Sequence, residues 1–204
     1  MGITLYHVEG SRSVRSLWLL NELGIDFDVE VMPFTLDALR SEDYLSIHPL
    51  GRVPCLKDDD TIIFESGAIT QYLCEKTGSP LMRKMGEPEH AEWLQWLHYA
   101  ETMAVHGASL IQQRVFIPSE LRSDAVKGIE ERRLGQTLSV LNKHLADREY
   151  MLASGFSAVD TNVGYSVQLA QSFIPIEKWE NVVAYRDRVI GRPAAQQSFP
   201  PNMR

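Results

Sequence analysis

The chain has 204 residues, of which 44% are hydrophobic and 23% charged, and its formal net charge is −7 at pH 7. This length and composition are typical of a globular protein that buries a core without disulfides or metals. The acidic balance argues against a nucleic-acid binder, which needs a basic face. No apolar run approaches the ~20 residues that a membrane span requires.

The first 78 residues alternate between strand and helix patterns. The predicted elements, in chain order, are a strand over 3–8, a helix over 13–23, a strand over 27–31, a short helix or irregular crossover over 36–45, a β-hairpin over 55–57 and 61–64, and a helix over 66–76. Gly24 and Gly78 stop the two longer helices. The helix between the first two strands predicts that they are parallel.

The pattern changes after Gly78. Residues 80–87 contain proline and glycine and predict a linker. Helical spacing follows over 88–113, 123–145, 157–172 and 181–190. Ser157 and Asp160 have the spacing of a capping box, with Asp in place of Glu. The sequence therefore predicts an α/β domain over 1–79 and an all-helical domain over 88–204.

The two cysteines, Cys55 and Cys74, lie far apart. They have neither the spacing of a dithiol redox centre nor that of a zinc site. The six histidines are scattered, without the i, i+3 or i, i+4 partner that a helical metal site needs. We therefore expect no metal, and two reduced, buried thiols in a cytoplasmic protein.

Two short segments combine turn residues with polar groups. Pro54 begins an apolar strand although proline has no N–H for a sheet. A cis Val53–Pro54 bond would turn the Val53 backbone outward to pair with an extended ligand, and a trans proline at a strand edge is the simpler interpretation. Glu65 and Ser66 open the next helix. Ser66 is either an N-cap alone, or also an N–H donor to a carboxylate beside Glu65.

The loop after the first strand contains Ser11, Arg12 and Ser13. In an open α/β sheet, ligands bind at such a loop, at the carboxyl end of a strand. A serine there would donate a hydrogen bond to a thiolate and lower the pKa of a thiol, or both serines would simply be caps. Arg15, one turn into the helix, is a candidate ion-pair partner for an acidic residue.

Taken together, these motifs resemble a cytosolic glutathione S-transferase over essentially the whole chain, most of all the bacterial and fungal members. The matching segments are Leu5-Tyr6, Ser11-Arg12-Ser13-Val14-Arg15, Leu17-Trp18-Leu19-Leu20, His48-Pro49-Leu50-Gly51-Arg52-Val53-Pro54, Glu65-Ser66-Gly67-Ala68-Ile69 and Phe156-Ser157-Ala158-Val159-Asp160. The resemblance implies a thioredoxin-like β-α-β-α-β-β-α domain that binds glutathione. It also implies that the all-helical domain provides a hydrophobic co-substrate pocket.

The resemblance implies a role for each residue of a glutathione site. The Val53 backbone, beside a cis Pro54, would bond the cysteinyl unit of glutathione. Glu65 and Ser66 would hold the γ-glutamyl group, and Arg52 would reach the glycyl carboxylate.

The catalytic hydroxyl has more than one candidate. Ser11 matches the thiol-activating serine of theta- and delta-like classes. Tyr6, near the catalytic tyrosine of alpha, mu and pi members, and Ser13 are the alternatives. Arg15 and His48 are expected to support the loops around the site.

In the helical domain, five residues at helical spacing are candidates for the co-substrate pocket, and they would equally suit the core: Met103, His106, Gly107, Leu110 and Phe116. The family also implies a homodimer. Glu101 would then contact the partner's glutathione, or would simply face solvent.

The expected activity is that of a transferase that conjugates the glutathione thiolate to small, apolar electrophiles and thereby detoxifies them. The alternatives are a glutathione-dependent peroxidase or isomerase on the same scaffold. A non-catalytic glutathione-binding interaction protein, from a different class, is the third.

Overall fold

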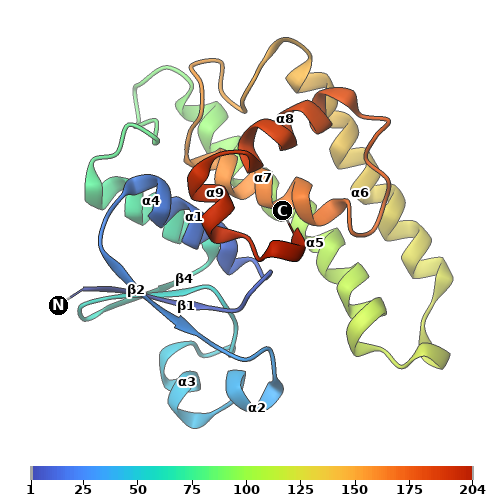
Figure 1. The fold of residues 1–204 in the computed structure, drawn as a ribbon, viewed down its shortest axis with the longest axis horizontal. Helices are drawn as coiled ribbons and strands as arrows, with labels where there is room; N and C mark the ends of the chain where they lie inside the picture. The colour runs from blue at the N-terminus through green and yellow to red at the C-terminus, as the bar shows by residue number, and fades with distance from the viewer. Residues whose placement is uncertain (1, 204) are drawn as a thin grey trace. The chain divides into compact units, whose positions relative to one another are not determined.

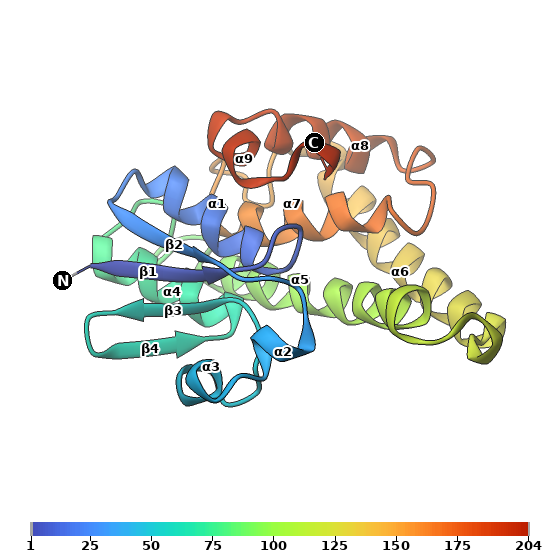
Figure 2. The same ribbon diagram turned by 60° about the horizontal axis from the view of Figure 1, so that its bottom comes forward.

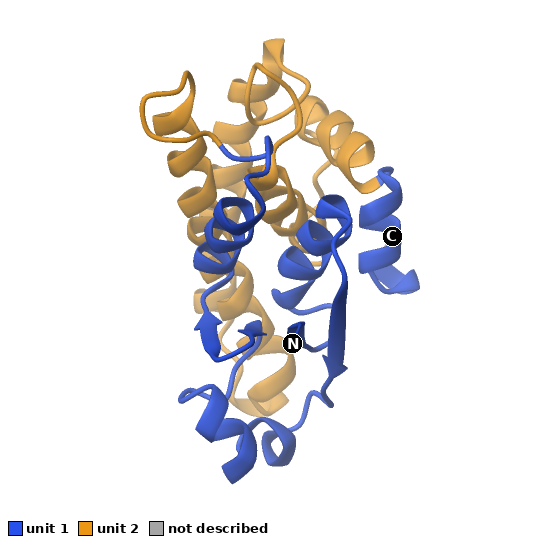
Figure 3. Cartoon of the chain, turned by 90° about the vertical axis from the view of Figure 1, so that its left-hand side faces the viewer, with its two compact units in different colours: residues 1–82, 191–204 blue, residues 83–190 orange. Residues whose placement is uncertain are grey.

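The computed structural model describes residues 2–203, which form two compact units (Figure 3). One unit contains the described residues up to Met82 and those from Gly191 onward, and the other contains residues 83–190. The helical unit therefore ends at Ile190, and not at the C-terminus as the sequence predicted. The reason is that the segment after Ile190 packs against the first helix of the chain and so belongs to the same unit as that helix.

The first unit is a sheet with flanking helices. Its elements are β1 (Ile3–His7), α1 (Ser13–Leu23), β2 (Phe27–Val31), α2 (Leu36–Leu39), α3 (Glu42–Ile47), β3 (Cys55–Asp58), β4 (Thr61–Phe64), α4 (Ser66–Thr77) and α9 (Pro193–Ser198). The strand order is β2-β1-β3-β4, with β1 parallel to β2 and antiparallel to β3, and β3 antiparallel to β4. This is the expected thioredoxin-like arrangement, with two short helices in place of the predicted crossover.

Helices α1 and α4 pack together on one face of the sheet, and α2 and α3 lie on the other side (Figures 1 and 2). Because side chains alternate along a strand, β1 contributes to both faces. Leu5 and His7 are buried on one face. Tyr6 points to the opposite face, where its ring lies 5.5 Å from that of Tyr44 in α3.

The segment after Ile190 is fixed to α1 by polar and aromatic contacts. The guanidinium of Arg192 donates two hydrogen bonds of 2.7 Å to the carboxylate of Glu22. Trp18 donates to the same carboxylate at 2.9 Å, and its ring lies 5.8 Å from that of Phe199. The sequence predicted a helix that ends at residue 190, but not that Pro193 begins the further helix α9.

The second unit is helical, as expected. Its main helices are α5 (His90–Ile111), α6 (Asp124–His144), α7 (Ala158–Ala170) and α8 (Glu180–Ile190). A π-helical turn over Gln112–Phe116 continues α5, where the sequence predicted one long helix. Among the described residues, none of the helices is long and apolar enough to cross a bilayer.

Helix α7 lies at the centre of the helical unit and is buried along almost its whole length. The predicted capping box at its start is confirmed, since the N–H of Ser157 donates to Asp160 at 2.8 Å. The same buried carboxylate accepts hydrogen bonds of 3.0 Å from the N–H of Met151 and from the hydroxyl of Tyr185. We call these four residues the Asp160 network.

Candidate functional site

Three segments that are distant in the sequence meet at one edge of the sheet. In the register of the sheet, Tyr6 lies opposite Cys55, and Cys55 lies opposite Phe64. Because β3 runs against both β1 and β4, the segment after β1, the segment before β3 and the segment after β4 all leave the sheet at this edge. They contain, respectively, Ser11, Val53-Pro54 and Glu65-Ser66. The structure thus brings together the residues predicted to bind and activate glutathione.

The segment after β1 holds two serines in different environments. Ser11 is half-buried, and its Oγ accepts the N–H of Ser13 at 3.2 Å. Ser13 is fully buried, and its Oγ accepts the N–H of Val8 at 3.1 Å. The Ser13 Oγ also lies 2.8 Å from the Ser11 Oγ and 2.7 Å from Nδ1 of His7. Of the two serines, Ser11 is therefore the one that a ligand can reach.

His7 is one of six scattered histidines, and no motif in the sequence marks it as a site residue. Its separation of six residues from Ser13 spans a strand, a turn and a helix start, so no single periodicity connects the two. A strand position that points to the helix-covered face, followed by a short turn, is the one signal that the sequence contains.

The segment before β3 includes a cis peptide bond between Val53 and Pro54, as the resemblance implied. Tyr44 anchors this segment from α3, because its hydroxyl donates to the carbonyl of Arg52 at 2.6 Å. The Arg52 side chain is exposed and Val53 is half-buried. The Val53 backbone and a cationic side chain are thus presented at the same edge.

The turn that leads into this segment depends on glycine and histidine. Gly51 has φ 56°, and a Cβ added to it would lie 2.1 Å from the carbonyl oxygen of Leu39, so only glycine fits. The buried ring of His48 accepts the N–H of Leu50 at 3.2 Å and lies 4.7 Å from the ring of Phe64. The His48 ring therefore joins the loop at Leu50 to Phe64 at the end of β4.

Helix α4 begins at the edge with Ser66 as its first residue. Glu65 is its N-cap residue, with φ 75°, so the prediction that Ser66 is the N-cap is wrong. The Ser66 hydroxyl is buried and accepts a hydrogen bond of 3.0 Å from the guanidinium of Arg15, which is also buried. Arg15 thereby joins α1 to the start of α4. The first N–H groups of α4 have no acceptor within the helix and can bind an anion.

Two further ionisable groups near this edge, Cys55 and Tyr6, are neutral at pH 7. Burial raises the pKa of Cys55 to about 11. Burial also raises the pKa of Tyr6, and the nearby Cys55 and Glu30 add to this effect. A Cys55 thiolate is therefore not available as a nucleophile at this edge. Within residues 2–203, no group of three His, Cys, Asp or Glu side chains is placed to hold a metal ion.

The candidates for a co-substrate pocket in the helical unit have different surroundings. Met103 is buried, and Gly107 packs against Leu169, whose Cδ2 would lie 3.3 Å from an added Cβ. Nδ1 of His106 lies 2.7 Å from the carboxylate of Glu130. These three candidates therefore have packing or pairing partners within the unit.

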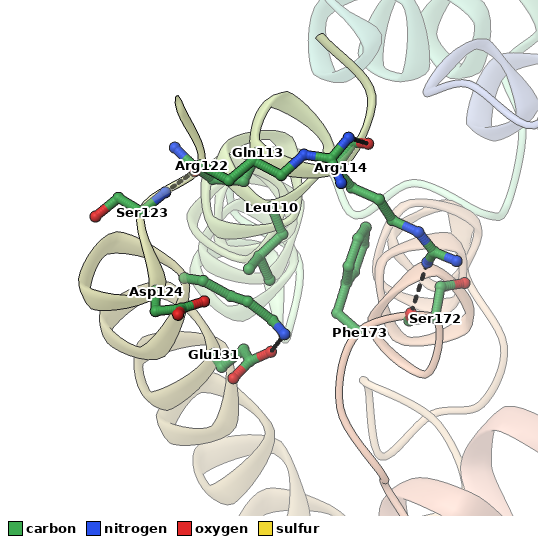
Figure 4. A pocket seen from close by; sticks show the side chains of 10 residues that line it. Leu110, Gln113, Arg114, Arg122, Ser123, Asp124, Glu131, Ser172 and Phe173 are labelled. Atoms are coloured by element: carbon green, nitrogen blue, oxygen red, sulfur yellow. Dashed lines mark hydrogen bonds and ion pairs between the residues drawn. The ribbon is translucent and has the colours of Figure 1, made fainter. Parts of the chain in front are cut away.

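A cavity of about 400 Å³ opens between the end of α5, the start of α6 and the segment after α7 (Figure 4). Leu110 and Phe173 form its apolar side, and Lys127 pairs with Glu131 across 3.7 Å on its polar side. Phe116, on the π-helical turn, is 56% exposed. Of the five candidates, Leu110 is the one that lines this cavity.

Known proteins resemble the chain in both sequence and structure. Residues 1–75 match the model of the glutathione S-transferase N-terminal domain. The glutathione S-transferase F13 of Arabidopsis thaliana is 31% identical over 209 residues, which cover 95% of this chain and 93% of the relative. A glutathione transferase structure from Methylococcus capsulatus is 27% identical with a TM-score of 0.82 and 96% of each chain covered. Another from Pseudomonas putida, with one glutathione disulfide bound per subunit, is 22% identical with a TM-score of 0.86, covering 97% and 90%.

A thioredoxin-like sheet followed by a helical unit defines a class of two-domain proteins built on the thioredoxin fold. Within this class, the 31% identity to the F13 relative, which extends over nearly all of both chains, identifies the family. The chain belongs to the glutathione S-transferase family.

Proposed function

We propose that this protein is a glutathione transferase, in which the thiolate of bound glutathione attacks an electrophilic carbon of a small apolar co-substrate. The observation that supports this proposal most directly is the meeting of Ser11, Val53-Pro54 and Glu65-Ser66 at one edge of the sheet. The relative from Pseudomonas putida, solved with glutathione disulfide, supports glutathione as the ligand.

The charges at the edge complement those of glutathione, which has two carboxylates, one ammonium group and a thiol. The exposed carboxylate of Glu65 would pair with the ammonium group. The N–H of Ser66, at the positive end of α4, would bind the adjacent carboxylate. The exposed Arg52 would reach the glycyl carboxylate, and the Val53 backbone would pair with the cysteinyl unit between them.

Ser11 is proposed as the catalytic residue, which donates its hydroxyl hydrogen to the sulfur. A free thiol has a pKa of about 8.5 and is mostly protonated at pH 7. Lowering this pKa by about two units requires on the order of 3 kcal/mol of thiolate stabilisation. One hydroxyl donor, together with the N-terminus of α1, provides stabilisation of that order. The bound thiol would then be largely ionised at neutral pH.

The cysteines of the protein are unsuited to this reaction. Burial raises the pKa of Cys55 to about 11 and that of Cys74 to about 12, with a smaller contribution from Glu75 in the latter case. Both thiols therefore remain protonated at pH 7. The reacting sulfur in the proposed function is that of glutathione.

The proposed function is tested by turnover with a panel of co-substrates in the presence of glutathione. Conjugation of a halogenated aromatic or an α,β-unsaturated carbonyl compound is the expected result. Reduction of an organic hydroperoxide alone, or isomerisation of a maleyl-type acid alone, would replace the transferase assignment by one of these activities. Tight glutathione binding without turnover of any compound would leave only a binding protein.

An Arg52→Ala variant sharpens this assay, with Arg40→Ala as the matched control, because both arginines are exposed in the same unit. We expect Arg52→Ala to raise the KM for glutathione roughly tenfold, since a charge-assisted bond contributes about 1.5 kcal/mol. Arg40→Ala should leave the KM unchanged. Equal KM values for both variants would remove Arg52 from the site.

We also propose that the protein acts as a cytoplasmic homodimer that detoxifies electrophiles. The half-buried Glu101 of α5 would contact the glutathione of the partner subunit. Sedimentation at micromolar concentration should show a single species of twice the 23.1 kDa chain mass. A monomer at that concentration would refute both the dimer and this role of Glu101.

A further inference from the structure

The Ser11 hydroxyl is the outermost member of a hydrogen-bonded series that runs into the protein. We call this series, which consists of His7, Ser13 and Ser11, the His7 network. The Ser13 Oγ lies 2.7 Å from Nδ1 of His7 and 2.8 Å from the Ser11 Oγ. His7 and Ser13 are only 4% and 0% exposed, whereas Ser11 is half-buried. The network thus connects a buried imidazole to the edge where the thiol is proposed to bind.

The number of lone pairs and protons on Ser13 restricts how this network can be ordered. A serine hydroxyl has one hydrogen to donate and two lone pairs that accept. One lone pair of Ser13 already accepts the N–H of Val8 at 3.1 Å. The carbonyl of Val8, at 3.2 Å, is outside the usual range for an O–H donor. One lone pair and one hydrogen therefore remain for the two short contacts, to His7 and to Ser11.

Two orders of donor and acceptor along the network satisfy these contacts. In the first order, His7 donates from Nδ1 to Ser13, and Ser13 donates to Ser11. The Ser11 oxygen then accepts, and its own hydrogen is available to an external acceptor. In the second order, Ser11 donates to Ser13, and Ser13 donates to Nδ1 of His7. The single hydrogen of Ser11 is then directed into the protein and cannot reach a ligand.

We propose that His7 and Ser13 are positioning residues, which hold the Ser11 hydroxyl hydrogen toward the sulfur of bound glutathione because His7 is in its Nδ1–H tautomer. This inference rests on the proposed function, since it concerns the direction of the Ser11 hydrogen bond to the sulfur. In the first order Ser11 also accepts the N–H of Ser13 at 3.2 Å. A hydroxyl that accepts hydrogen bonds is polarised and becomes a stronger donor.

The imidazole acts in this arrangement as a neutral donor. Burial lowers the pKa of His7, and the carboxylate of Glu9 opposes this only in part. His7 is therefore neutral at pH 7 and does not keep the proton that the thiol loses on ionisation. That proton passes to solvent, and the His7 network fixes only the direction in which Ser11 donates.

The first test compares Ser13→Ala with Ser16→Ala. Both serines are fully buried in α1, but among the described residues the Ser16 hydroxyl has no hydrogen-bond partner. We expect Ser13→Ala to raise the pKa of the bound thiol by about one unit, from about 6.5 to about 7.5, and therefore to lower kcat about threefold at pH 7. The KM for glutathione should change less than twofold. Ser16→Ala should leave both quantities at the wild-type value.

The same substitution in the Ser11→Ala background separates positioning from a structural role. If Ser13 acts through Ser11, Ser13→Ala should cause less than a twofold further loss of kcat when Ser11 is already absent. A loss of about threefold in both backgrounds, or an unchanged thiol pKa in Ser13→Ala alone, would overturn the proposed positioning while leaving Ser11 as the catalytic residue. An unchanged thiol pKa in Ser11→Ala would overturn the catalytic assignment and the positioning together.

Substitutions of His7 test the tautomer, and they leave Ser13 in place as the acceptor of the Val8 N–H. His7→Asn keeps an N–H donor close to the position of Nδ1, whereas His7→Phe keeps the ring and removes the donor. We expect the thiol pKa of His7→Asn to lie within about 0.3 units of the wild-type value, and that of His7→Phe to match Ser13→Ala. A His7→Phe variant with the wild-type thiol pKa would overturn the proposal even if Ser13→Ala fails to fold.

Discussion

Each of the two units contains a buried polar network at the start of a helix, and the two networks end differently. The Asp160 network is closed, because the fully buried carboxylate receives hydrogen bonds from Met151, Ser157 and Tyr185, all within the helical unit. The His7 network is open, because its last member, Ser11, is half-buried at the edge of the sheet.

This difference separates polar groups that stabilise the fold from polar groups that are available for chemistry. In a closed network every donor meets an acceptor in the native state, so removal of one member leaves buried groups unsatisfied. In an open network the terminal group can be satisfied by solvent or by a ligand. We therefore expect substitutions in the Asp160 network to change stability, and substitutions at Ser11 to change activity.

The largest effect is expected for Asp160→Ala. The substitution leaves two backbone N–H groups and the Tyr185 hydroxyl without their acceptor, and it should lower the free energy of unfolding by roughly 3 to 5 kcal/mol. Urea unfolding at pH 7 measures this loss. Asp187→Ala, which removes an exposed carboxylate from α8, is the control and should cost less than about 0.5 kcal/mol. Similar losses for the two variants would contradict the role of the Asp160 network.

The pH dependence of stability provides the second prediction. Burial raises the pKa of Asp160 to about 6, although the hydrogen bonds from Met151, Ser157 and Tyr185 oppose the shift. Because this pKa is higher in the folded state, protonation of Asp160 adds stability to that of its hydrogen bonds; this added part is fully present below about pH 4 and is lost as the pH rises through 6. The change is on the order of 3 kcal/mol.

A comparison with Asp160→Asn isolates this contribution from those of the other carboxyl groups, because the variant does not titrate at this position. The wild-type advantage in unfolding free energy over Asp160→Asn should shrink as the pH is raised from 4 to 7. An advantage that stays constant or grows over this range would show that the carboxyl group does not titrate as described.

Ser11→Ala is expected to have the opposite profile. Loss of the hydroxyl should lower turnover at pH 7 roughly 25-fold, because the thiol pKa returns from about 6.5 toward its free value of about 8.5 and the thiolate fraction falls accordingly. The free energy of unfolding should change by less than about 1 kcal/mol, since Ser11 is half-buried. Ser46→Ala, at an exposed position of α3, serves as the control for both measurements. A large stability loss with normal turnover would instead place Ser11 among the polar groups that stabilise the fold.

Ser66→Ala should have the smallest effect of these substitutions, and the quantity that changes is the affinity for glutathione. It removes the acceptor of a hydrogen bond from the buried Arg15 at the start of α4, and it should weaken glutathione binding about tenfold. Ser198→Ala removes another buried hydroxyl from the same unit, one that Asn21 contacts at 2.8 Å. Calorimetric titration should show unchanged glutathione affinity for Ser198→Ala. Equal affinities for the two variants would argue that Ser66 has no part in binding.

Much of the fold follows from local signals in the sequence. The β-hairpin around Asp58-Asp59-Asp60, the helix stops at Gly24 and Gly78 and the capping box at Ser157 are each determined by a few adjacent residues. The α9 helix was missed because Pro193 is equally suited to end one helix and to begin another. The start of α4 at Ser66 was predicted correctly, but its N-cap was assigned to Ser66 instead of Glu65, because Glu65 has a positive φ, which its residue type does not indicate.

The candidate site was predictable in its members but not in its internal order. The motifs that contain Ser11, Pro54 and Glu65 are visible in the sequence, and their resemblance to a family brought them together. The contacts of Ser13 with His7 and of Arg15 with Ser66 depend on tertiary packing, which no local pattern encodes. The different burial of Ser11 and Ser13, which distinguishes the two serines, likewise becomes visible only in the folded chain.

The central claim is that bound glutathione is held as a thiolate by Ser11, and proton release on binding measures this most directly. Calorimetric titrations of glutathione at pH 7, in buffers that differ in their enthalpy of ionisation, give the number of protons released per bound ligand. If the thiol pKa falls from about 8.5 to about 6.5, binding should release about 0.7 protons, and Ser11→Ala should release almost none. Tight binding to the wild-type protein without proton release would contradict the claim.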